Sequence, residues 1–454
     1  MLKRPGGSIR QRTIHPERVM ALGFLLVILA GTLLLALPEA TQTGQSIGLG
    51  RSLFTATSAV CVTGLIVVDT GTTFSLFGQI VLLALIQTGG LGFMVFATLT
   101  WGAMGRRITL RNRVLIRESM GAGTLQGVVE LIKWYGLMAV LIELAGAAIL
   151  ALRFVPALGW GRGLYFGLWH SVSAFCNAGF DLFGHFSSLT GWNSDPVVLL
   201  TVAMLIVLGG LGFSVMDEVI HRRTRRRMSL HARIVLVMTA SLLAAGTVFF
   251  LAAEWNNEKT MGGMSLGDRA ANAFLQSATM RTAGFNSVDL MSMRDSSKLM
   301  SVILMFIGAS PASTGGGVKT TTVSVLLLIM LSVIRGDDDV NVMGRRLPTE
   351  LMRRALSILF ITLAILLGGT MVLTIAEGGR YSFLDLLFET TSAMATVGVS
   401  SVGTPNLTTV SKAVLVPMMY FGRVGPLTMA VALASRQHRN INRIHYPEEN
   451  IPIG

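Results

Sequence analysis

Long apolar runs alternate along the chain with shorter segments that mix apolar and polar positions. The runs are around 20 residues or longer, which is about the length that an α-helix needs to cross a hydrocarbon core about 30 Å thick. We therefore predict eight membrane-spanning helices, the sixth of them interrupted. The predicted spans are 19–37, 79–98, 128–155, 197–220, 234–253, 299–334, 356–376 and 413–434.

Four of the mixed segments repeat one pattern, in which an aromatic residue is followed ten positions later by a glycine and then an apolar residue. The segments read Phe54-TATSAVCVT-Gly64, Trp169-HSVSAFCNA-Gly179, Phe274-LQSATMRTA-Gly284 and Phe388-ETTSAMATV-Gly398. Their glycines are separated by 115, 105 and 114 residues. Near-equal periods of this kind indicate a repeat architecture. The predicted modules are residues 1–105, 106–227, 228–345 and 346–454.

Each repeated segment lies between two predicted spans. It is too short and too polar to cross a membrane and too apolar for an ordinary water-exposed loop, so a re-entrant half-helix followed by an extended strand is expected. Irregular backbone at membrane depth is tolerated only where it is buried in protein or lines a water-filled cavity. Each module is therefore predicted to consist of a span, a pore loop and a second span.

Basic residues cluster at 3–18, 106–117, 222–227, 335–354 and 436–443, that is, between the modules and at both ends. Because such clusters mark the cytoplasmic side of a membrane protein, both termini are expected in the cytoplasm and the four pore loops enter from outside. Two spans per module give every module the same orientation, and such repeats are related by an axis along the membrane normal. The prediction is an all-α membrane protein with pseudo-fourfold symmetry around a central pore.

The repeated glycines suit a site for a desolvated cation. Backbone carbonyls from four loops replace the hydration shell of K⁺ in selectivity filters, and glycine adopts positive φ without steric cost. The alternative is that these glycines only allow close helix packing, which is the preferred interpretation for Gly89, Gly90 and Gly92 and for the matching glycines 209, 210 and 212. The predicted filter residues are Val62, Thr63, Gly64, Asn177, Ala178, Gly179, Thr282, Ala283, Gly284, Thr396, Val397 and Gly398.

Three residues share the position three before the glycine. Cys61 and Cys176 are expected to pack behind the filter rather than line it, because a free cysteine behaves as a small buried hydrophobe. Arg281 occupies this position in the third module, where a positive charge on the ion path would repel cations. We expect Arg281 to point away from the path and to bind a carboxylate or carbonyl groups.

The interrupted sixth span predicts a gate. Its proline and three consecutive glycines break a helix, and an irregular loop below the third filter segment is expected to block the path and move aside; a static kink is the alternative. Arg423, an intramembrane charge, is expected to dock on the loop carbonyls or to form an electrostatic barrier. The predicted gating residues are Gly308, Ala309, Ser310, Pro311, Ala312, Ser313, Thr314, Gly315, Gly316, Gly317, Val318, Lys319 and Arg423.

Lys319 is expected to reach the cytoplasmic interface, and the acidic run 337–339 is interpreted as a solvated turn.

Composition agrees with the membrane class, because only 13% of residues are charged against about 25% in soluble domains. The net charge of +13 is therefore assigned to topology rather than to nucleic-acid binding. Two cysteines predict no disulfide framework, and the first apolar run is expected to be retained as a span.

The segments TSAVCVTGL, SAFCNAGF, TMRTAGF and SAMATVGV resemble the selectivity filters of the Ktr/Trk/HKT cation-transporter superfamily. The sequence STGGGVKTTT resembles its intramembrane gating loop, and Arg423 matches its arginine in the last module. The resemblance covers essentially the whole chain and is greatest to the membrane subunits of Ktr systems: the two extra N-terminal spans of TrkH-type proteins are missing, and Gly64 stands where many plant members have serine. The ending YPEENIPIG resembles a segment at the dimer interface of these subunits.

This resemblance implies K⁺ uptake across a bacterial inner membrane, with Na⁺ as an activator in many members and no covalent cofactor. It also implies a homodimer with one pore per subunit and a cytosolic KtrA-like ring that binds ATP or ADP, or cyclic di-AMP, and controls the gate. A less selective Na⁺/K⁺ transporter is the alternative within the superfamily. A membrane enzyme is disfavoured, because the histidines are scattered and carboxylates such as Glu143 and Glu389 are unpaired by spacing. A scaffold without transport would leave the four filter-like loops unexplained.

Overall fold

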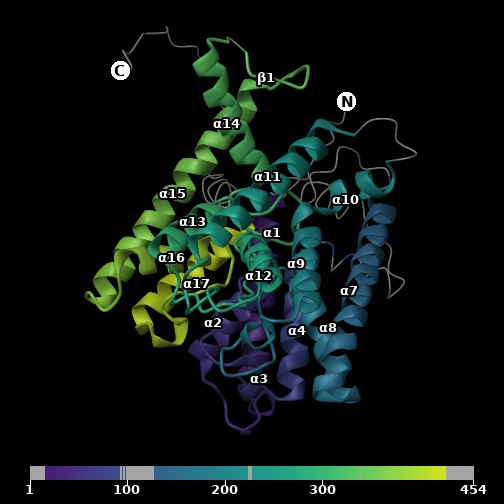
Figure 1. Cartoon of the computed structure of the whole chain (residues 1–454), viewed down its shortest axis with the longest axis vertical. Helices are drawn as coiled ribbons and strands as arrows, with labels where there is room; N and C mark the ends of the chain where they lie inside the picture. Colours follow the sequence, from purple (N-terminus) through teal and green to yellow (C-terminus); the bar gives the residue numbers. More distant parts are fainter. Residues whose placement is uncertain are drawn as a thin grey trace, which may run out of the picture.

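The computed structural model describes residues 16–92, 95, 98, 127–222, 228–337 and 339–425, and this part of the chain is almost entirely helical (Figure 1). One order of elements recurs: a long helix, a shorter buried helix, an irregular segment and a second helix. The four groups are α1 (Pro16–Leu35), α2 (Leu49–Val60) and α4 (Leu76–Leu91); α7 (Val128–Leu158), α8 (Trp160–Phe175) and α9 (Pro196–Leu211); α11 (Leu230–Ala253), α12 (Leu266–Thr279) and α13 (Asp295–Phe306); α15 (Thr349–Glu377), α16 (Phe383–Met394) and α17 (Thr409–Val424).

The remaining elements are short or extend a group. They are α3 (Thr70–Thr73), α10 (Phe213–Ile220), α14 (Thr320–Arg335), the 3₁₀ turns Pro38–Ala40, Thr190–Trp192 and Thr404–Asn406, and the antiparallel pair β1 (Asn341–Val342) and β2 (Arg345–Arg346). In Figure 1 the β1–β2 hairpin lies at one end of the molecule with the end of α14, whereas α3 lies at the opposite end.

Among the described residues, four helices are long and apolar enough to cross a membrane, namely α1 from Arg18, α7, α11 and α15. Only 22% to 44% of the apolar windows of these helices is buried inside the protein. Large side chains such as Leu26, Leu152 and Ile375 are left 66% to 74% exposed. A surface of this kind is stable in lipid, where the helix satisfies its own backbone groups. The chain is a multi-pass membrane protein.

The short helices α2, α8, α12 and α16 form the centre of the molecule, and each packs on the long helix of its own group. The second helix of each group packs on the short helix of the next group: α4 on α8, α9 on α12, α13 on α16, and α17 back on α2. The four groups therefore close into a ring through one type of contact. This closure brings together four segments that are more than 100 residues apart in the sequence.

The predicted span 197–220 is not one helix. Helices α9 and α10 meet at Gly212 with a bend of 101°, a break that the prediction of this span did not include. Gly212 has φ +90°, and an added Cβ would collide with the Pro311 carbonyl oxygen. The packing interpretation is therefore incomplete for Gly212, and likewise for Gly92, which caps α4 at φ +84° with open space around it.

The ends of other predicted spans lie outside the described residues. Helix α4 ends at Leu91 and α17 at Val424, and most of the continuation of both predicted spans, together with the C-terminal ending, is not described. The sixth span is interrupted as expected, because α13 ends at Phe306 and α14 begins at Thr320.

Polar side chains define where several helices begin. A serine, threonine or aspartate side chain accepts a backbone N–H in the first turn, which satisfies one of the donors that a helix leaves free at its start. In α12 and α16 the capping serine is followed three residues later by an aspartate, a variant of the capping-box pattern. The capping residues are Ser75, Asp195, Ser229, Ser265, Ser382 and Thr408.

Two buried carboxylates accept a backbone N–H at the start of a helix other than their own. Glu254, just after α11, accepts the backbone N–H of Arg294 at the start of α13 (3.1 Å). Glu377, at the end of α15, accepts the N–H of Thr408 at the start of α17 (2.9 Å). Burial alone would raise the pKa of Glu254, but hydrogen bonds from three side chains and one backbone N–H outweigh it and hold that pKa below its usual value.

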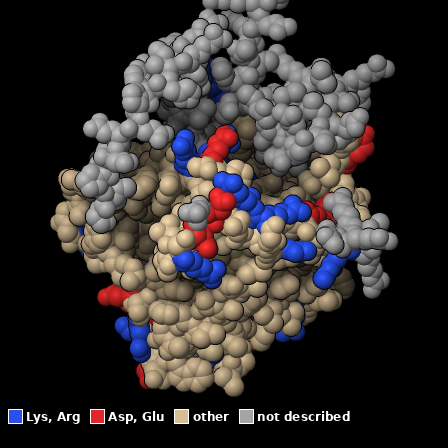
Figure 2. All heavy atoms as spheres, turned by 90° about the horizontal axis from the view of Figure 1, so that it is seen from above, with Lys and Arg blue, Asp and Glu red and all other residues tan. Residues whose placement is uncertain are grey.

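Charged residues gather at the end of the molecule that carries the hairpin. Figure 2 shows Lys and Arg beside Asp and Glu over the described part of this face, above a largely uncharged flank. Asp339 forms an ion pair with Arg346 across the hairpin (2.8 Å), which fits a solvated turn; Asp338 lies outside the described residues. The basic clusters at 106–117 and 436–443, and most of those at 3–18 and 222–227, also lie outside them.

Candidate ion pathway

The four repeated glycines meet at the centre of the ring. A Cβ added at Gly64 would collide with the carbonyl oxygen of Ala178, the residue before Gly179. The same holds at Gly179 for the oxygen of Ala283, at Gly284 for that of Val397 and at Gly398 for that of Thr63. Each glycine thus faces the carbonyl that precedes the next glycine, in the order of the sequence. We call Gly64, Gly179, Gly284 and Gly398 the glycine ring.

The backbone around the glycine ring alternates in conformation. The ring glycines have φ between +70° and +96°, which any other residue adopts only with strain. The residues two positions earlier also have positive φ, from +53° to +76°, although none of them is glycine. These pre-glycine residues are Val62, Asn177, Thr282 and Thr396. Sequence reasoning missed this feature, because αL positions are normally signalled by glycine.

The pre-glycine residues owe their conformation to the ends of the short helices. In three groups the next residue donates its N–H to the carbonyl five positions back, as in a Schellman C-cap: Thr63 to Ser58, Ala178 to Ser173 and Val397 to Ser392, all at 2.8 Å. The fourth group differs, since Ala283 donates to Thr279 at 3.0 Å. These ends of the helices, which carry partial negative charge, therefore adjoin the ring.

Two serine side chains hold the ring itself. The Ser58 hydroxyl accepts the Gly64 N–H (3.1 Å), and the Ser392 hydroxyl accepts the Gly398 N–H (3.0 Å). At the same position in the second group, Ser173 donates to the Phe180 carbonyl (2.7 Å). We did not single out these serines from the sequence, although a Ser-Ala pair recurs six residues before three of the glycines.

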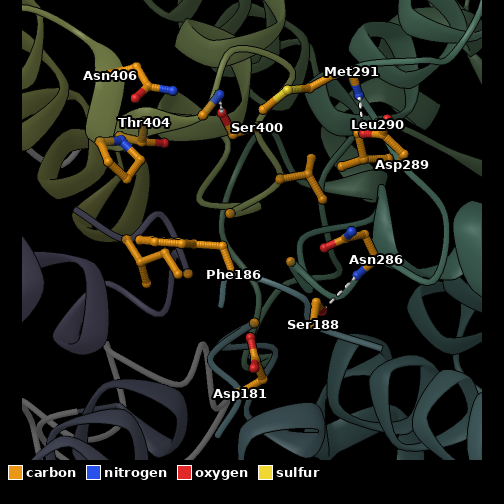
Figure 3. A pocket seen from close by; sticks show the side chains of 18 residues that line it. Asp181, Phe186, Ser188, Asn286, Asp289, Leu290, Met291, Ser400, Thr404 and Asn406 are labelled. Carbon is orange, nitrogen blue, oxygen red and sulfur yellow. Dashed lines mark hydrogen bonds between the residues drawn. The ribbon is translucent and has the colours of Figure 1, made fainter. Parts of the chain in front are cut away.

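A cavity of about 310 Å³ opens on one side of the glycine ring (Figure 3). All four ring glycines line it, so they form its floor. The residues two positions after the glycines also line it, one from each group. These post-glycine residues are Ile66, Asp181, Asn286 and Ser400. Among the described residues that line this cavity there is no Lys, Arg or His.

The loop 307–319 lies on the opposite side of the ring, where it contacts pre-glycine residues. A Cβ added at Gly315 would collide with the hydroxyl of Thr282, and one at Gly316 with that of Thr396. Two pre-glycine residues and the loop are therefore in direct contact, and the close approach requires glycine at both loop positions.

Backbone hydrogen bonds order the loop and tie it to α9. Within the loop, Gly308 N–H donates to Val318 O (2.9 Å) and Ala309 N–H to Gly316 O (3.3 Å). The N–H groups of Ser310 and Thr314 donate to the carbonyls of Gly210 (3.1 Å) and Gly209 (3.2 Å) at the end of α9. The remaining loop residues complete this fold: Pro311 lies against Gly212, Ala312 O accepts Phe213 N–H, Ser313 donates to Ser310 O, and Gly317 packs on Gly308.

Two cations contact the loop. The Arg423 guanidinium donates to Thr314 O in the loop, and to the carbonyls of Gly89 and Gly90 at the end of α4. Two roles were expected for Arg423, docking on the loop carbonyls or forming an electrostatic barrier, and these contacts correspond to docking. The expectation for Lys319 differs from the structure, because its Nζ donates to Gly315 O within the loop (2.7 Å).

Glycines of the second helices pack on the ends of the short helices. An added Cβ would collide with Val60 O at Gly89, with Phe175 O at Gly209 and with Met394 O at Gly422. The packing interpretation of Gly89 and Gly209 is confirmed. Cys176 lies against Gly90 and donates to Gln87 Oε1 (3.3 Å); both cysteines are fully buried and free, which agrees with packing behind the ring.

Arg281 is buried and donates to the hydroxyl of Thr239 in α11 (3.3 Å). It points away from the glycine ring as expected, but its recorded partner is a hydroxyl group, so the expectation of a carboxylate or carbonyl partner was wrong. Helix α11 offers Thr239 at that depth, and its carbonyls are already engaged in the helix.

Comparison with known proteins agrees with this architecture. Residues 12–443 match the TrkH family, described as a cation transport protein. The chain belongs to the TrkH family. Its relatives include the Ktr system potassium uptake protein B of Bacillus subtilis, at 41% identity over 97% of both chains, and that of Vibrio alginolyticus, at 39% over 99% of this chain and 97% of the relative.

Another relative is the potassium/sodium uptake protein NtpJ of Enterococcus hirae, at 37% identity over 98% of both chains. The crystal structure of the potassium transporter TrkH from Vibrio parahaemolyticus has the same fold, with a TM-score of 0.72 at 18% identity over 95% of this chain and 87% of that one.

The chemistry of the TrkH-family ring suits a monovalent cation. Its oxygen donors are neutral backbone carbonyls, and rings of such dipoles replace the hydration shell of K⁺. Within the described residues no three His, Cys, Asp or Glu side chains come together as a transition-metal site would require.

Proposed function

We propose that this protein takes up K⁺ through the glycine ring. One observation carries the proposal: four glycines from four groups form a closed ring with alternating positive-φ backbone, and an open cavity lies directly above them. In this arrangement the carbonyl oxygen before each glycine faces the neighbouring glycine, so that oxygens from four loops gather around one centre. Rings of such carbonyls replace the hydration shell of K⁺. The names of the relatives with 39% and 41% identity support K⁺ as the ion.

The full architecture that we propose has eight spans in four modules, 1–105, 106–227, 228–345 and 346–454, with pseudo-fourfold symmetry. The recurring element order and the ring of identical helix contacts support it. The selectivity filter is assigned to the residues from two positions before each ring glycine to the glycine itself. The hairpin end is assigned to the cytoplasm of a bacterial inner membrane, because described basic residues gather there. The cavity then opens to the outside.

We propose that the loop 307–319 is the gate. Its contacts with Thr282 and Thr396 support a position directly below the proposed filter. Its hydrogen bonds to α9 and Arg423 support a defined closed position. Opening requires these hydrogen bonds to break or exchange. A partner that pulls on α14, which directly follows the loop, would supply the free energy for this change.

The regulatory partner in this proposal is a cytosolic KtrA-like ring that binds ATP or ADP, or cyclic di-AMP, and the transporter itself is a homodimer. Two lines support this: the resemblance of the filter and gate segments to Ktr systems, and the word "system" in the names of the relatives. Na⁺ is proposed as an activator on the same resemblance. If the cytosolic ring is absent, the loop stays closed in this proposal, and we expect low K⁺ uptake.

A second candidate function is combined Na⁺ and K⁺ transport, which the name of the Enterococcus hirae relative favours. The two candidates differ in the ability of Na⁺ to compete for the path. Four glycines in the ring favour K⁺, since each glycine leaves its neighbour's carbonyl unobstructed.

The test is Rb⁺ uptake and growth at limiting K⁺ in bacteria that lack their own K⁺ importers, with and without a co-expressed cytosolic ring. Wild type should restore uptake with the partner, and Na⁺ in excess should compete weakly. Gly284→Ser should reduce the preference for K⁺ over Na⁺. Absence of uptake by well-expressed wild type with its partner would contradict the proposal, and strong Na⁺ competition in wild type would favour the second candidate.

A further inference from the structure

The cavity above the glycine ring carries an asymmetric set of side chains. The four post-glycine residues form its next layer, one per group, and they differ completely: Ile66, Asp181, Asn286 and Ser400. A four-subunit channel built from identical chains would repeat one residue here. Because all four groups belong to one chain, a single group can contribute a carboxylate to this layer.

The contacts of these residues decide which of them is free to bind an ion. Ser400 accepts the N–H of Gly403 (2.9 Å), so its hydroxyl is engaged. Asn286 donates its side-chain amide to Val288 O (3.2 Å), and Figure 3 shows its side-chain oxygen directed into the cavity. Asp181 accepts the backbone N–H groups of Phe183 (3.0 Å) and Gly184. A carboxylate keeps further lone pairs beside two such bonds, and Asp181 lies two residues from the ring glycine Gly179. Ile66 contributes no polar group.

We propose that Asp181 and Asn286 form an outer cation site, where incoming K⁺ exchanges part of its hydration shell before it enters the glycine ring. This inference rests on the proposed inward K⁺ path. Asp181 supplies the charge and Asn286 a neutral oxygen from the adjacent group. A carboxylate in a cavity without basic side chains raises the local concentration of cations. The ring carbonyls then select among the cations that the site collects.

Asp289 offers a built-in comparison. It is the other carboxylate around the cavity, but its oxygens accept the Met291 N–H (3.0 Å) and the Ser292 hydroxyl (2.6 Å) in an exposed turn. It therefore serves the turn, and it belongs to no post-glycine position. If any negative charge near the entrance were sufficient to attract K⁺, removing the charge of Asp181 or of Asp289 would have the same effect on uptake. The outer-site proposal predicts that only the loss of the Asp181 charge weakens uptake.

The test compares Asp181→Asn with Asp289→Asn in Rb⁺ uptake by intact cells, with membrane expression measured for each. Asparagine still accepts the Phe183 N–H, so this change removes the charge and keeps the loop. We expect Asp181→Asn to raise the KM for Rb⁺ about five- to tenfold with Vmax retained, since one unit charge at a few ångströms has about this effect in an aqueous site. Asp289→Asn should leave KM within about twofold.

A rescue variant separates an electrostatic role from a structural one. Ile66→Asp in the Asp181→Asn background returns one carboxylate to the same layer from another group, and it should restore most of the wild-type KM. The preference for K⁺ over Na⁺ should be unchanged in all three variants, because the ring is intact. An unchanged KM in Asp181→Asn, or an equal rise in Asp289→Asn, would overturn the outer site. Loss of Vmax without rescue would show that Asp181 only supports the loop. Failure of wild type to transport Rb⁺ would instead count against the proposed function.

Discussion

At the scale of single residues, the ring depends on hydroxyl groups that accept backbone N–H groups. Ser58 and Ser392 hold Gly64 and Gly398 in a conformation that no helix or sheet supplies. A buried N–H group that loses its acceptor costs about 1–3 kcal/mol, which is comparable to the strain of a non-glycine residue at positive φ. The ring conformation is therefore sensitive to these two side chains.

Ser58→Ala should lower the preference for K⁺ over Na⁺, because Gly64 N–H then has no acceptor and the carbonyls around it lose their fixed direction. The measurement is inhibition of Rb⁺ uptake by Na⁺. Ser277→Ala is the matched control: this serine lies in the equivalent helix α12 but donates to Leu243 O in α11 (3.0 Å). Equal selectivity in Ser58→Ala and wild type would contradict the assigned role.

External pH should change the apparent affinity for K⁺ through Asp181. Burial raises the pKa of this carboxyl to about 7, against the opposing effect of the Phe183 N–H bond, and the nearby Asp69 carboxylate adds to the rise. Asp289 lines the same cavity, and His170 accepts the N–H of Leu182, the residue after Asp181, at Nε2, so that this nitrogen carries no proton.

The sign follows from the charge of the carboxyl. Above neutral pH Asp181 is negative and attracts K⁺, and below it the proton removes the charge, so KM should rise as external pH falls from 8 to 6. Rb⁺ uptake at fixed membrane potential measures this, and in Asp181→Asn the dependence should be much weaker. The same pH dependence in wild type and in the variant would exclude Asp181 as its source.

At the scale of elements, the broken second helices determine how closely the loop approaches the pre-glycine residues. Gly316→Ala places a methyl group against the Thr396 hydroxyl, so the closed position of the loop is destabilised. We expect Rb⁺ uptake without the cytosolic partner to increase severalfold. Gly368→Ala, in α15 with open space around it, is the control and should behave as wild type. Uptake by Gly316→Ala that still requires the partner would argue against the loop as the gate.

The outer ends of α13 and α17 depend on the carboxylates that cap them from the preceding long helix. Glu254→Gln should lower the free energy of unfolding by about 1–3 kcal/mol, because the charge-assisted bonds to the first turn of α13 weaken. The folded-state pKa of Glu254 is depressed, so this contribution is complete above the unfolded value near 4.5 and is lost as pH falls through the folded value. Thermal unfolding in detergent at pH 7 and pH 4 measures it. The exposed Glu258→Gln is the control, and equal losses in both variants would contradict the assignment.

At the scale of the whole molecule, a single path through four groups predicts electrogenic flux. Liposomes that contain K⁺ and the Gly316→Ala variant should lose K⁺ when diluted into Na⁺ buffer, and a protonophore should then allow proton entry, which a pH dye detects. A membrane potential contributes about 2.3 kcal/mol per charge per 100 mV, so reversing it should reverse the flux. Flux that is insensitive to potential would contradict a passive pore.

Much of this architecture was predictable from the sequence. The period of the glycine segments and the apolar runs predicted the repeated groups, because a lipid solvent demands long apolar helices and because four copies of one segment carry the same local backbone preference. The irregular loop was predictable from its proline and glycines. Helix α10 was not, since a continuous apolar run does not reveal a 101° bend at one glycine.

The contacts between groups were decided only by tertiary structure. The periodicity of the sequence identifies the four ring glycines. It does not reveal that each glycine faces the carbonyl group of the residue before the next ring glycine, because that contact joins segments more than 100 residues apart. The pairing of Arg281 with Thr239 likewise joins residues that are distant in sequence. The sequence by itself determined which segments repeat and which helices face lipid, because local composition controls helix formation and lipid exposure. The tertiary structure decided which carbonyl oxygen meets which glycine, because only ring closure fixes the direction of a carbonyl.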